Sequence, residues 1–253
     1  MEVGVPGNKI KTLCIIPARY GSSRFKGKPL AKIDGVPMIK RTYIQAVKSK
    51  TIDAIVVATD DNRIFSFCES ENMSVILTSN NCLTGTDRVA EVAKHKNYSD
   101  YDFYINIQGD EPIIDPIVID QLVSAYIKYG DNYIAYNLYK KIENISEVNS
   151  NSIIKVVVNE DNELMYMSRL AVPYSKSNLL PAYKMQVPAY GYTSTALDVF
   201  SKYSKTINEQ FEDVELLRFI DLGYKLKMIE TNAVSISVDF PEDVLKIEKH
   251  LNS

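Results

Sequence analysis

The stretch IIPARYGSSRFKGKPL, residues 15–30, begins as an apolar strand and continues as a loop that gathers Arg19, Arg24, Lys26 and Lys28. Its glycines and proline break regular structure, so a solvated loop is one interpretation. A cradle for a polyanion is the other, because ligands of an open α/β sheet bind beyond the carboxyl ends of its strands. The spacing fits neither a Walker P-loop nor a GxGxxG motif, so this stretch alone leaves both interpretations open.

Apolar runs alternate with amphipathic runs around this stretch. The apolar runs are short and rich in β-branched residues, as buried parallel strands are, and they cover residues 12–18, 53–60, 73–79 and 102–110. Between them, apolar residues recur with helical periodicity over residues 37–50, 62–72 and 86–96. This alternation predicts an α/β fold with a doubly wound, mostly parallel sheet and right-handed crossovers.

The pattern changes after Tyr129. Strand-like runs with alternating or aromatic character follow at residues 132–141, 152–169 and 187–195, and NEDNE at 159–163 predicts a hairpin turn. We therefore expect an antiparallel or mixed extension that covers the substrate. Residues 209–223 predict one amphipathic helix that stops at Gly223, and residues 241–251 predict a last helix with a proline in its first turn.

Composition excludes several classes of protein. The chain has 253 residues, 45% of them hydrophobic, which suffices for a large core. A net charge of -3 at pH 7 argues against a general nucleic-acid or membrane binder. Cys14, Cys68 and Cys82 lack metal-ligand spacing, which favours free thiols in a reducing compartment. Since no apolar run approaches the length of a membrane helix and the first residues lack the apolar core of a signal peptide, we expect a cytoplasmic protein.

The segment INIQGDEPIID, residues 105–115, places carboxylates after an apolar strand. Asp115, followed by a proline, is the better placed cap for the next helix, which leaves Asp110 for another role. Mg²⁺ in phosphate sites is typically held by one or two carboxylates, so Asp110 is a candidate metal ligand. The second candidate is Asp239, which also follows a strand-like run and precedes a helix. By itself, the position of Asp239 favours a helix cap or turn over a metal ligand.

Five segments in order carry a resemblance to a known family. They are IIPARYGSSRFKGKPL, VATDD (57–61), TGTDRVAE (84–91), INIQGDEP (105–112) and VDFPEDV (238–244). Together they resemble the 3-deoxy-manno-octulosonate (Kdo) cytidylyltransferase family over nearly the whole chain. The resemblance implies a Rossmann-like core, CTP as donor, Mg²⁺ as cofactor, a homodimer and release of pyrophosphate. It also implies that the anomeric hydroxyl of a 2-keto-3-deoxy sugar acid attacks the α-phosphorus of CTP.

The resemblance assigns most of the nucleotide site. Triphosphate-binding positions fall on Arg19, Arg24 and Lys28, where guanidinium and ammonium groups suit phosphate oxygens. Lys26 stands where the family often has proline and is left out. The metal positions are Asp110 and Asp239. The other nucleotide-binding positions are Pro17, Ala18, Ala58, Thr59, Asp60, Thr84, Gly85, Thr86, Arg88 and Gln108, with the second segment beside the cytosine.

The acceptor side departs from the family pattern. Gln186 stands where a histidine is usual before the YGY element, although Tyr190 and Tyr192 persist. The family also has a helix P-L-E-x-x-E-x-L-E-Q-L-R whose Glu–Gln pair meets sugar hydroxyls, and the most natural alignment puts Arg218 and Phe219 there. We expect the acceptor to contact Gln108, Arg169, Gln186, Tyr190, Tyr192 and Arg218.

Three functions stay open at this point. The first is transfer of CMP to Kdo for lipopolysaccharide or capsule synthesis, and the second is the same reaction on another acidic sugar, a modified octulosonate or a nonulosonate. The third is a non-catalytic nucleotide-binding protein. We expect one nucleotidyltransferase domain, with a CTP-binding core at 12–130, an acceptor and dimerisation region at 131–235 and a metal-ligand segment with a helix at 236–253.

Overall fold

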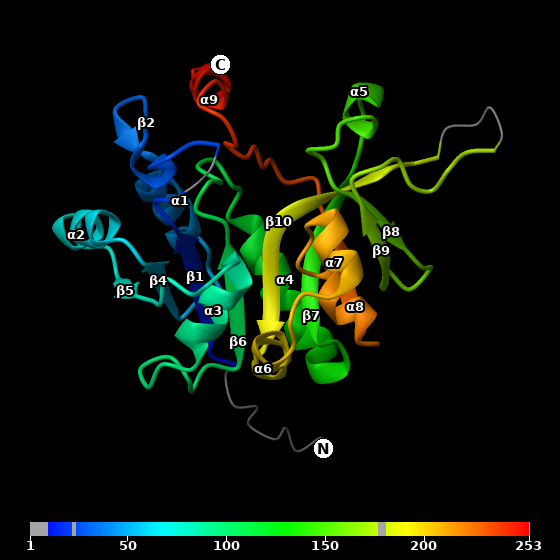
Figure 1. The fold of residues 1–253 in the computed structure, drawn as a ribbon, viewed down its shortest axis with the longest axis horizontal. Coiled ribbons are helices and arrows are strands. Elements are labelled where there is room, and N and C mark those ends of the chain that lie inside the picture. The colour runs from blue at the N-terminus through cyan, green and yellow to red at the C-terminus, as the bar shows by residue number, and fades with distance from the viewer. Residues whose placement is uncertain (1–9, 22–23, 177–180, 253) are drawn as a thin grey trace, which may run out of the picture.

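The computed structural model describes residues 10–21, 24–176 and 181–252, and these residues build a nine-stranded sheet with helices on both faces (Figure 1). Its main path runs in the order β11-β7-β10-β6-β1-β4-β5. The amino-terminal strands are β1 (Thr12–Ala18), β4 (Ala54–Thr59), β5 (Val75–Leu77) and β6 (Phe103–Ile107). They pair in parallel, which confirms the predicted α/β sheet.

The carboxyl-terminal strands form the mixed extension that the sequence predicts. They are β7 (Ala135–Lys141), β8 (Lys155–Val158), β9 (Leu164–Ser168), β10 (Lys184–Thr193) and β11 (Leu226–Glu230). The long β10 pairs antiparallel with β6, β7 and β8, so it joins the parallel core to the β8–β9 hairpin. The register of β10 shifts between Val187 and Tyr190, and buried Asn137 donates to the carbonyls of Val187 and Ala189 there.

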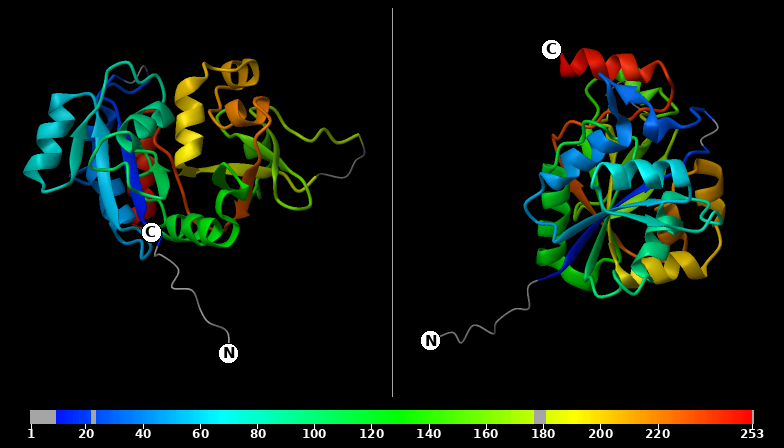
Figure 2. Two further views of the ribbon diagram at one scale, coloured as in Figure 1. Left: turned by 90° about the horizontal axis from the view of Figure 1, so that it is seen from below. Right: turned by 90° about the vertical axis from the view of Figure 1, so that its left-hand side faces the viewer.

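Helices cover both faces of the sheet (Figures 1 and 2). One face carries α1 (Met38–Val47), α2 (Asn62–Ser70) and α4 (Ile117–Tyr129), and the other carries α3 (Gly85–Ala93), α6 (Ser194–Lys202) and α8 (Leu217–Asp221). The remaining elements are η1 (Lys28–Leu30), β2 (Lys32–Ile33), β3 (Val36–Pro37), η2 (Gly130–Asn132), α5 (Ile145–Val148), α7 (Ile207–Glu212) and α9 (Asp243–Leu251).

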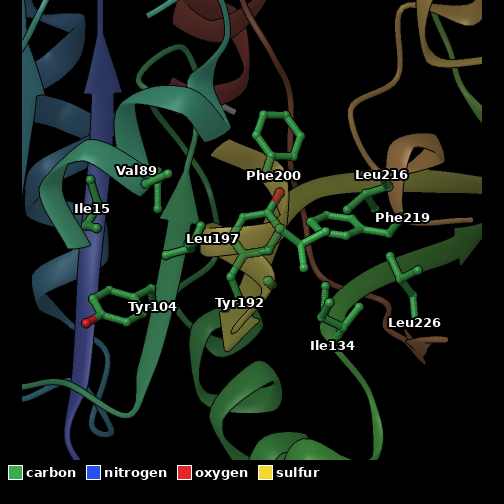
Figure 3. Packing of buried hydrophobic residues seen from close by; sticks show 14 of the residues in the cluster. Ile15, Val89, Tyr104, Ile134, Tyr192, Leu197, Phe200, Leu216, Phe219 and Leu226 are labelled. Atoms are coloured by element: carbon green, nitrogen blue, oxygen red, sulfur yellow. The ribbon is translucent and has the colours of Figure 1, made fainter. Parts of the chain in front are cut away.

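The core has one large apolar cluster on each face of the sheet, and a smaller third cluster includes Ile33, Ile113 and Val238. Along β1, Ile15 points into the cluster under α3 and α6, while Ile16 points into the cluster under α1 and α4. Around β10, Tyr192 packs among Leu197, Phe200 and Phe219 (Figure 3). Burying each such side chain contributes about 1.5–3 kcal/mol. The two large clusters fix β1 and β6, the strands whose carboxyl ends carry polar residues at the cleft.

Two predicted elements differ from the structure. The expected single helix over residues 209–223 is broken into α7 and α8, because Asp213 adopts the left-handed conformation with φ 51°. The strand-like run before Asp239 pairs with no strand among the described residues. Its backbone bonds instead to the loop after β6, where the Val238 amide donates to the Asp110 carbonyl over 3.0 Å and the Asp115 amide donates to the Val234 carbonyl over 3.1 Å. These two bonds join segments that are remote in the sequence. The run before Asp239 therefore has the residue pattern of a strand but does not pair as part of a sheet.

Candidate active site

A cleft of about 270 Å³ opens beyond the carboxyl ends of β1 and β6. From β1 and the loop after it, the cleft is lined by Pro17, Ala18, Arg19, Arg24 and Lys28. Other predicted residues that line it are Thr84, Gly85, Arg88, Gln108, Asp110 and Asp239. Residues predicted from separate segments of the chain are thus brought to one cavity, at the edge where an open α/β sheet binds ligands.

Local contacts shape the cationic loop after β1. Gly27 adopts φ 74°, and its amide donates to the Tyr20 carbonyl over 2.9 Å, which turns the chain back toward the cleft. A side chain at Gly27 would meet the Tyr20 ring at 3.0 Å. The Arg63 guanidinium of α2 lies 3.3 Å from the centroid of the same ring. The loop therefore rests on α2 through Tyr20, while Arg24 and Lys28 face the cleft.

Two ion pairs connect this loop with the candidate metal ligands. Lys28 Nζ lies 2.5 Å from Asp110 Oδ2 and donates to the Val238 carbonyl over 2.8 Å. Arg24 Nη2 lies 3.1 Å from Asp239 Oδ1. Each carboxylate that is expected to bind a metal ion is thus paired with a basic side chain that is expected to bind phosphate. The predicted metal-binding and phosphate-binding residues therefore lie at the same place in the cleft.

The start of α3 forms another wall. Thr84 caps the helix, and its side chain and that of Asp87 form a reciprocal capping box with the backbone amides. Gly85 brings this turn against the Gln108 side chain, since a Cβ there would lie 3.2 Å from Gln108 Nε2. Arg88 is almost fully buried, donates to Thr78 and pairs with Asp60 at 3.0 Å. The pair ties α3 to the end of β4.

Asp110 and Asp239 have the chemistry of a divalent-cation site. Among the described residues, no group of three or more His, Cys, Asp and Glu side chains could hold a metal ion. A cation between these two carboxylates would need oxygen ligands from a bound molecule, as Mg²⁺ does in phosphate sites. The donor set therefore fits Mg²⁺ bound together with a triphosphate.

Glu111, next to Asp110, points away from the cleft and is fully buried. Its carboxylate accepts hydrogen bonds from the hydroxyls of Ser235, over 2.5 Å, and Ser237. Burial and the neighbouring Asp110 charge raise the pKa of Glu111 to about 8, although both serine bonds act in the opposite direction. Asp110 thus faces the cleft, whereas the neighbouring Glu111 faces the protein interior.

The wall contributed by the carboxyl-terminal half carries Lys205, Asp213 and Glu215. Lys205 Nζ lies 3.5 Å from Asp213 Oδ1. Half-buried Glu215 accepts a hydrogen bond from the Thr86 amide over 2.9 Å. No lysine or arginine within the described ranges forms an ion pair with it. Burial raises the pKa of Glu215. Asp213 is therefore paired with cations, whereas Glu215 is not, and the sequence pattern had singled out none of the three.

Other predicted residues lie outside the cavity. Ala58 and Thr59 are fully buried in β4, and Thr86 is buried with its hydroxyl 2.9 Å from that of Tyr192. Tyr190 stacks on Tyr192, with 6.2 Å between ring centroids. None of these side chains lines the cleft; they support its walls from behind.

Arg169 and Gln186 also serve as supports in the structure. Arg169 donates from Nε to the Glu212 carbonyl over 2.6 Å and from Nη2 to the Asp213 carbonyl over 3.2 Å, so it holds the turn before Glu215. Gln186 is buried and donates to the Asn137 side chain over 3.2 Å. Neither lines the cleft.

Arg218 requires a correction, because the residue is only 3% exposed and does not line the cleft. It forms two 2.6 Å bonds to Glu209 and donates to the carbonyls of Phe200 and Tyr203. Phe219 is fully buried. Aligning the final arginine of the P-L-E-x-x-E-x-L-E-Q-L-R element with Arg218 moves its Glu–Gln pair to Glu215 and Leu216. The alignment expected from sequence was therefore wrong by three residues. The position of the final arginine in the element could have revealed the correct alignment.

Comparison with known proteins identifies the family of the chain. The family model described as "Cytidylyltransferase" matches residues 13–237. Two relatives are described as 8-amino-3,8-dideoxy-manno-octulosonate cytidylyltransferase. The one from Shewanella frigidimarina is 38% identical, over 96% of this chain and 99% of its own length. The one from Shewanella pealeana is 39% identical, over 94% and 97%.

A solved structure is similar over the whole fold. It is described as CMP:2-keto-3-deoxy-manno-octonic acid synthetase complexed with CTP, and it superposes with a TM-score of 0.88 at 33% identity. The match covers 96% of this chain and 98% of the other. In the part of the chain that the structure describes, no helix has the length and apolar character needed to cross a membrane.

Proposed function

The chain belongs to the cytidylyltransferase family and acts on a Kdo-like sugar acid, and from this premise we propose that its acceptor is 8-amino-3,8-dideoxy-manno-octulosonate. In the proposed reaction, the anomeric oxygen bonds to the α-phosphorus of CTP and the bond to the β-phosphate oxygen breaks. Pyrophosphate leaves, and the hydroxyl proton is released. The product is the CMP-activated sugar acid.

The donor half of the cleft supplies charge at the positions that this reaction needs. Arg19, Arg24 and Lys28 line the cavity after β1, where they would bind the phosphates that become the leaving group. Little covalent chemistry falls on the protein in such a displacement, so positioning and charge neutralisation carry most of the catalysis. Before the nucleotide binds, Arg24 and Lys28 are held in the cleft by Asp239 and Asp110.

We propose that Asp110 and Asp239 hold Mg²⁺. Bound there, the ion would neutralise negative charge on the phosphate and lower the pKa of the attacking hydroxyl. Their shared cleft and their paired cations support this assignment. The two carboxylates would position the cation, while Lys28 and Arg24 would turn to the phosphates.

The acceptor assignment depends on one observation, the carboxylate of Glu215 on the cleft wall without a cationic partner among the described residues. Taking a carboxylate even partly out of water is costly unless it is paired, so a ligand ammonium would be favoured beside half-buried Glu215. The amino group of the proposed acceptor would supply that charge, whereas the hydroxyl of Kdo would supply only a neutral donor.

The test measures the release of pyrophosphate in the presence of CTP and Mg²⁺ with three acceptors: 8-amino-3,8-dideoxy-manno-octulosonate, Kdo and a nonulosonate. We expect the highest kcat/KM on the amino sugar. Glu215→Gln should lower that value and narrow the preference over Kdo, while Asp198→Asn, an exposed carboxylate change on α6, should alter neither. Equal or better use of Kdo by the wild type would reject the amino acceptor and leave Kdo activation as the function.

We also propose that the enzyme works as a homodimer, as the family resemblance implies. Sedimentation velocity at working concentration tests this directly. A mass of one chain under assay conditions would refute it.

A further inference from the structure

Glu111 connects the loop after β6 with the segment that leads to Asp239, at the candidate metal site. It follows Asp110 directly, and its side chain has no exposed surface. Its two carboxylate oxygens accept separate hydrogen bonds, one from the Ser235 hydroxyl and one from the Ser237 hydroxyl. The segment that leads to Asp239 is thereby attached to the residue beside Asp110.

The segment that carries Asp239 has no sheet ladder to hold it. In the stretch from 232 to 239 the described backbone forms no strand, so other bonds must position it. The Val238 amide donates to the Asp110 carbonyl, and Lys28 Nζ donates to the Val238 carbonyl. Glu111 adds two side-chain bonds to this segment. Together they fix its register against the end of β6.

A second carboxylate holds the other side of Asp239. The amides of Asp239 and Phe240 both donate to Asp243 Oδ2, over 3.0 and 2.9 Å. Asp239 therefore lies between an anchor before it, Glu111, and an anchor after it, Asp243. Since groups that orient a metal ligand affect metal affinity about 10–100-fold, both anchors bear on any cation that Asp239 binds.

We propose that Glu111 is a positioning residue, which acts through Ser235 and Ser237 to hold Asp239 at the distance from Asp110 that a divalent cation requires. The inference rests on the proposed metal role of Asp110 and Asp239. The Glu111 carboxylate bonds to the segment that brings Asp239 to the cleft beside Asp110.

The test measures Mn²⁺ affinity by electron paramagnetic resonance in the presence of CTP, on the full chain without acceptor. The Ser235→Ala/Ser237→Ala variant should bind Mn²⁺ about tenfold more weakly. Glu111→Gln should also weaken Mn²⁺ binding, whereas Ser237→Thr, which keeps the hydroxyl, should stay within twofold of wild type. The matched control Ser201→Ala removes an exposed serine hydroxyl bonded to a carbonyl on α6 and should change nothing. Affinity for CTP in EDTA should be unchanged throughout.

Combining Glu111→Gln with Asp239→Asn separates an effect on the position of Asp239 from a general loss of protein stability. If Glu111 acts through Asp239, Glu111→Gln adds little further loss of Mn²⁺ affinity in the Asp239→Asn background. Fully additive losses, or unchanged Mn²⁺ affinity in the folded serine variants, would overturn the inference. If instead Asp110→Asn and Asp239→Asn themselves leave Mn²⁺ affinity unchanged, the proposed metal site fails, and the inference fails with it.

Discussion

Lys28 Nζ lies 2.5 Å from Asp110 Oδ2, so a phosphate-binding candidate and a metal-binding candidate are partners in one ion pair. The pair joins the loop after β1 to the end of β6, two strands that are neighbours in the sheet. Removing either charge changes the surroundings of the other.

Lys28→Ala should raise the KM for CTP and lower kcat/KM by about 10–100-fold, because it removes a charged hydrogen bond to phosphate. Lys26→Ala is the matched control, since Lys26 lies on the same loop, is exposed and does not line the cleft. Steady-state kinetics and calorimetry with CTP would measure both. Wild-type CTP affinity in Lys28→Ala would remove this lysine from the phosphate site.

Asp110→Asn and Asp239→Asn should each lower kcat by about 10²–10³-fold, as loss of a preorganised charge at the reacting centre does. Both side chains face the cleft rather than the core, so thermal unfolding should change little. Turnover is measured at saturating Mg²⁺. Near-normal turnover in one variant would exclude that residue as a metal ligand.

Arg218→Met should destabilise the protein by about 3–5 kcal/mol, because Glu209 would be left buried and unpaired. Arg218→Met with Glu209→Leu should recover most of that loss. Urea unfolding gives both values, and the acceptor KM of the double variant should stay near wild type. A stable single variant with a raised acceptor KM would return Arg218 to the acceptor site.

Gly191→Ala should destabilise by at least about 1–3 kcal/mol through overpacking. A Cβ at this position of β10 would lie 2.1 Å from the Phe103 ring, which is stacked on Tyr126. Gly21→Ala is the control, since its methyl group would meet nothing within 4 Å. Equal thermal stability of the two variants would contradict the packing described for this part of the sheet.

The preference for the amino acceptor should depend on pH. Burial raises the pKa of Glu215, so as pH falls this carboxylate takes up a proton earlier than an ordinary glutamate does and loses the charge that would pair with an ammonium. The ratio of kcat/KM for the amino sugar over Kdo should therefore fall as pH is lowered. Glu215→Gln should flatten this dependence. A ratio that does not change with pH in the wild type would argue against the pairing.

Much of the fold and of the donor site follows from local sequence pattern. Strand and helix periodicity predicted the parallel sheet, and β1 has the predicted bounds Thr12–Ala18. Because the carboxyl ends of parallel strands meet at one edge, polar residues after separate strands were expected to converge. Arg24, Lys28 and Asp110 do line one cleft, and their roles in binding stay predictions.

Tertiary contacts decided the acceptor side and the course of the chain near Asp239. Periodicity over residues 209–223 is helical, but the left-handed turn at Asp213 divides the helix and leaves Glu215 on the cleft wall. Arg218 is buried because Glu209 and two distant carbonyls satisfy its guanidinium. The partners of Glu111 lie 124 and 126 residues away. Sequence spacing determines which side chains share a face of one element, whereas bonds between remote segments depend on how the whole sheet is assembled.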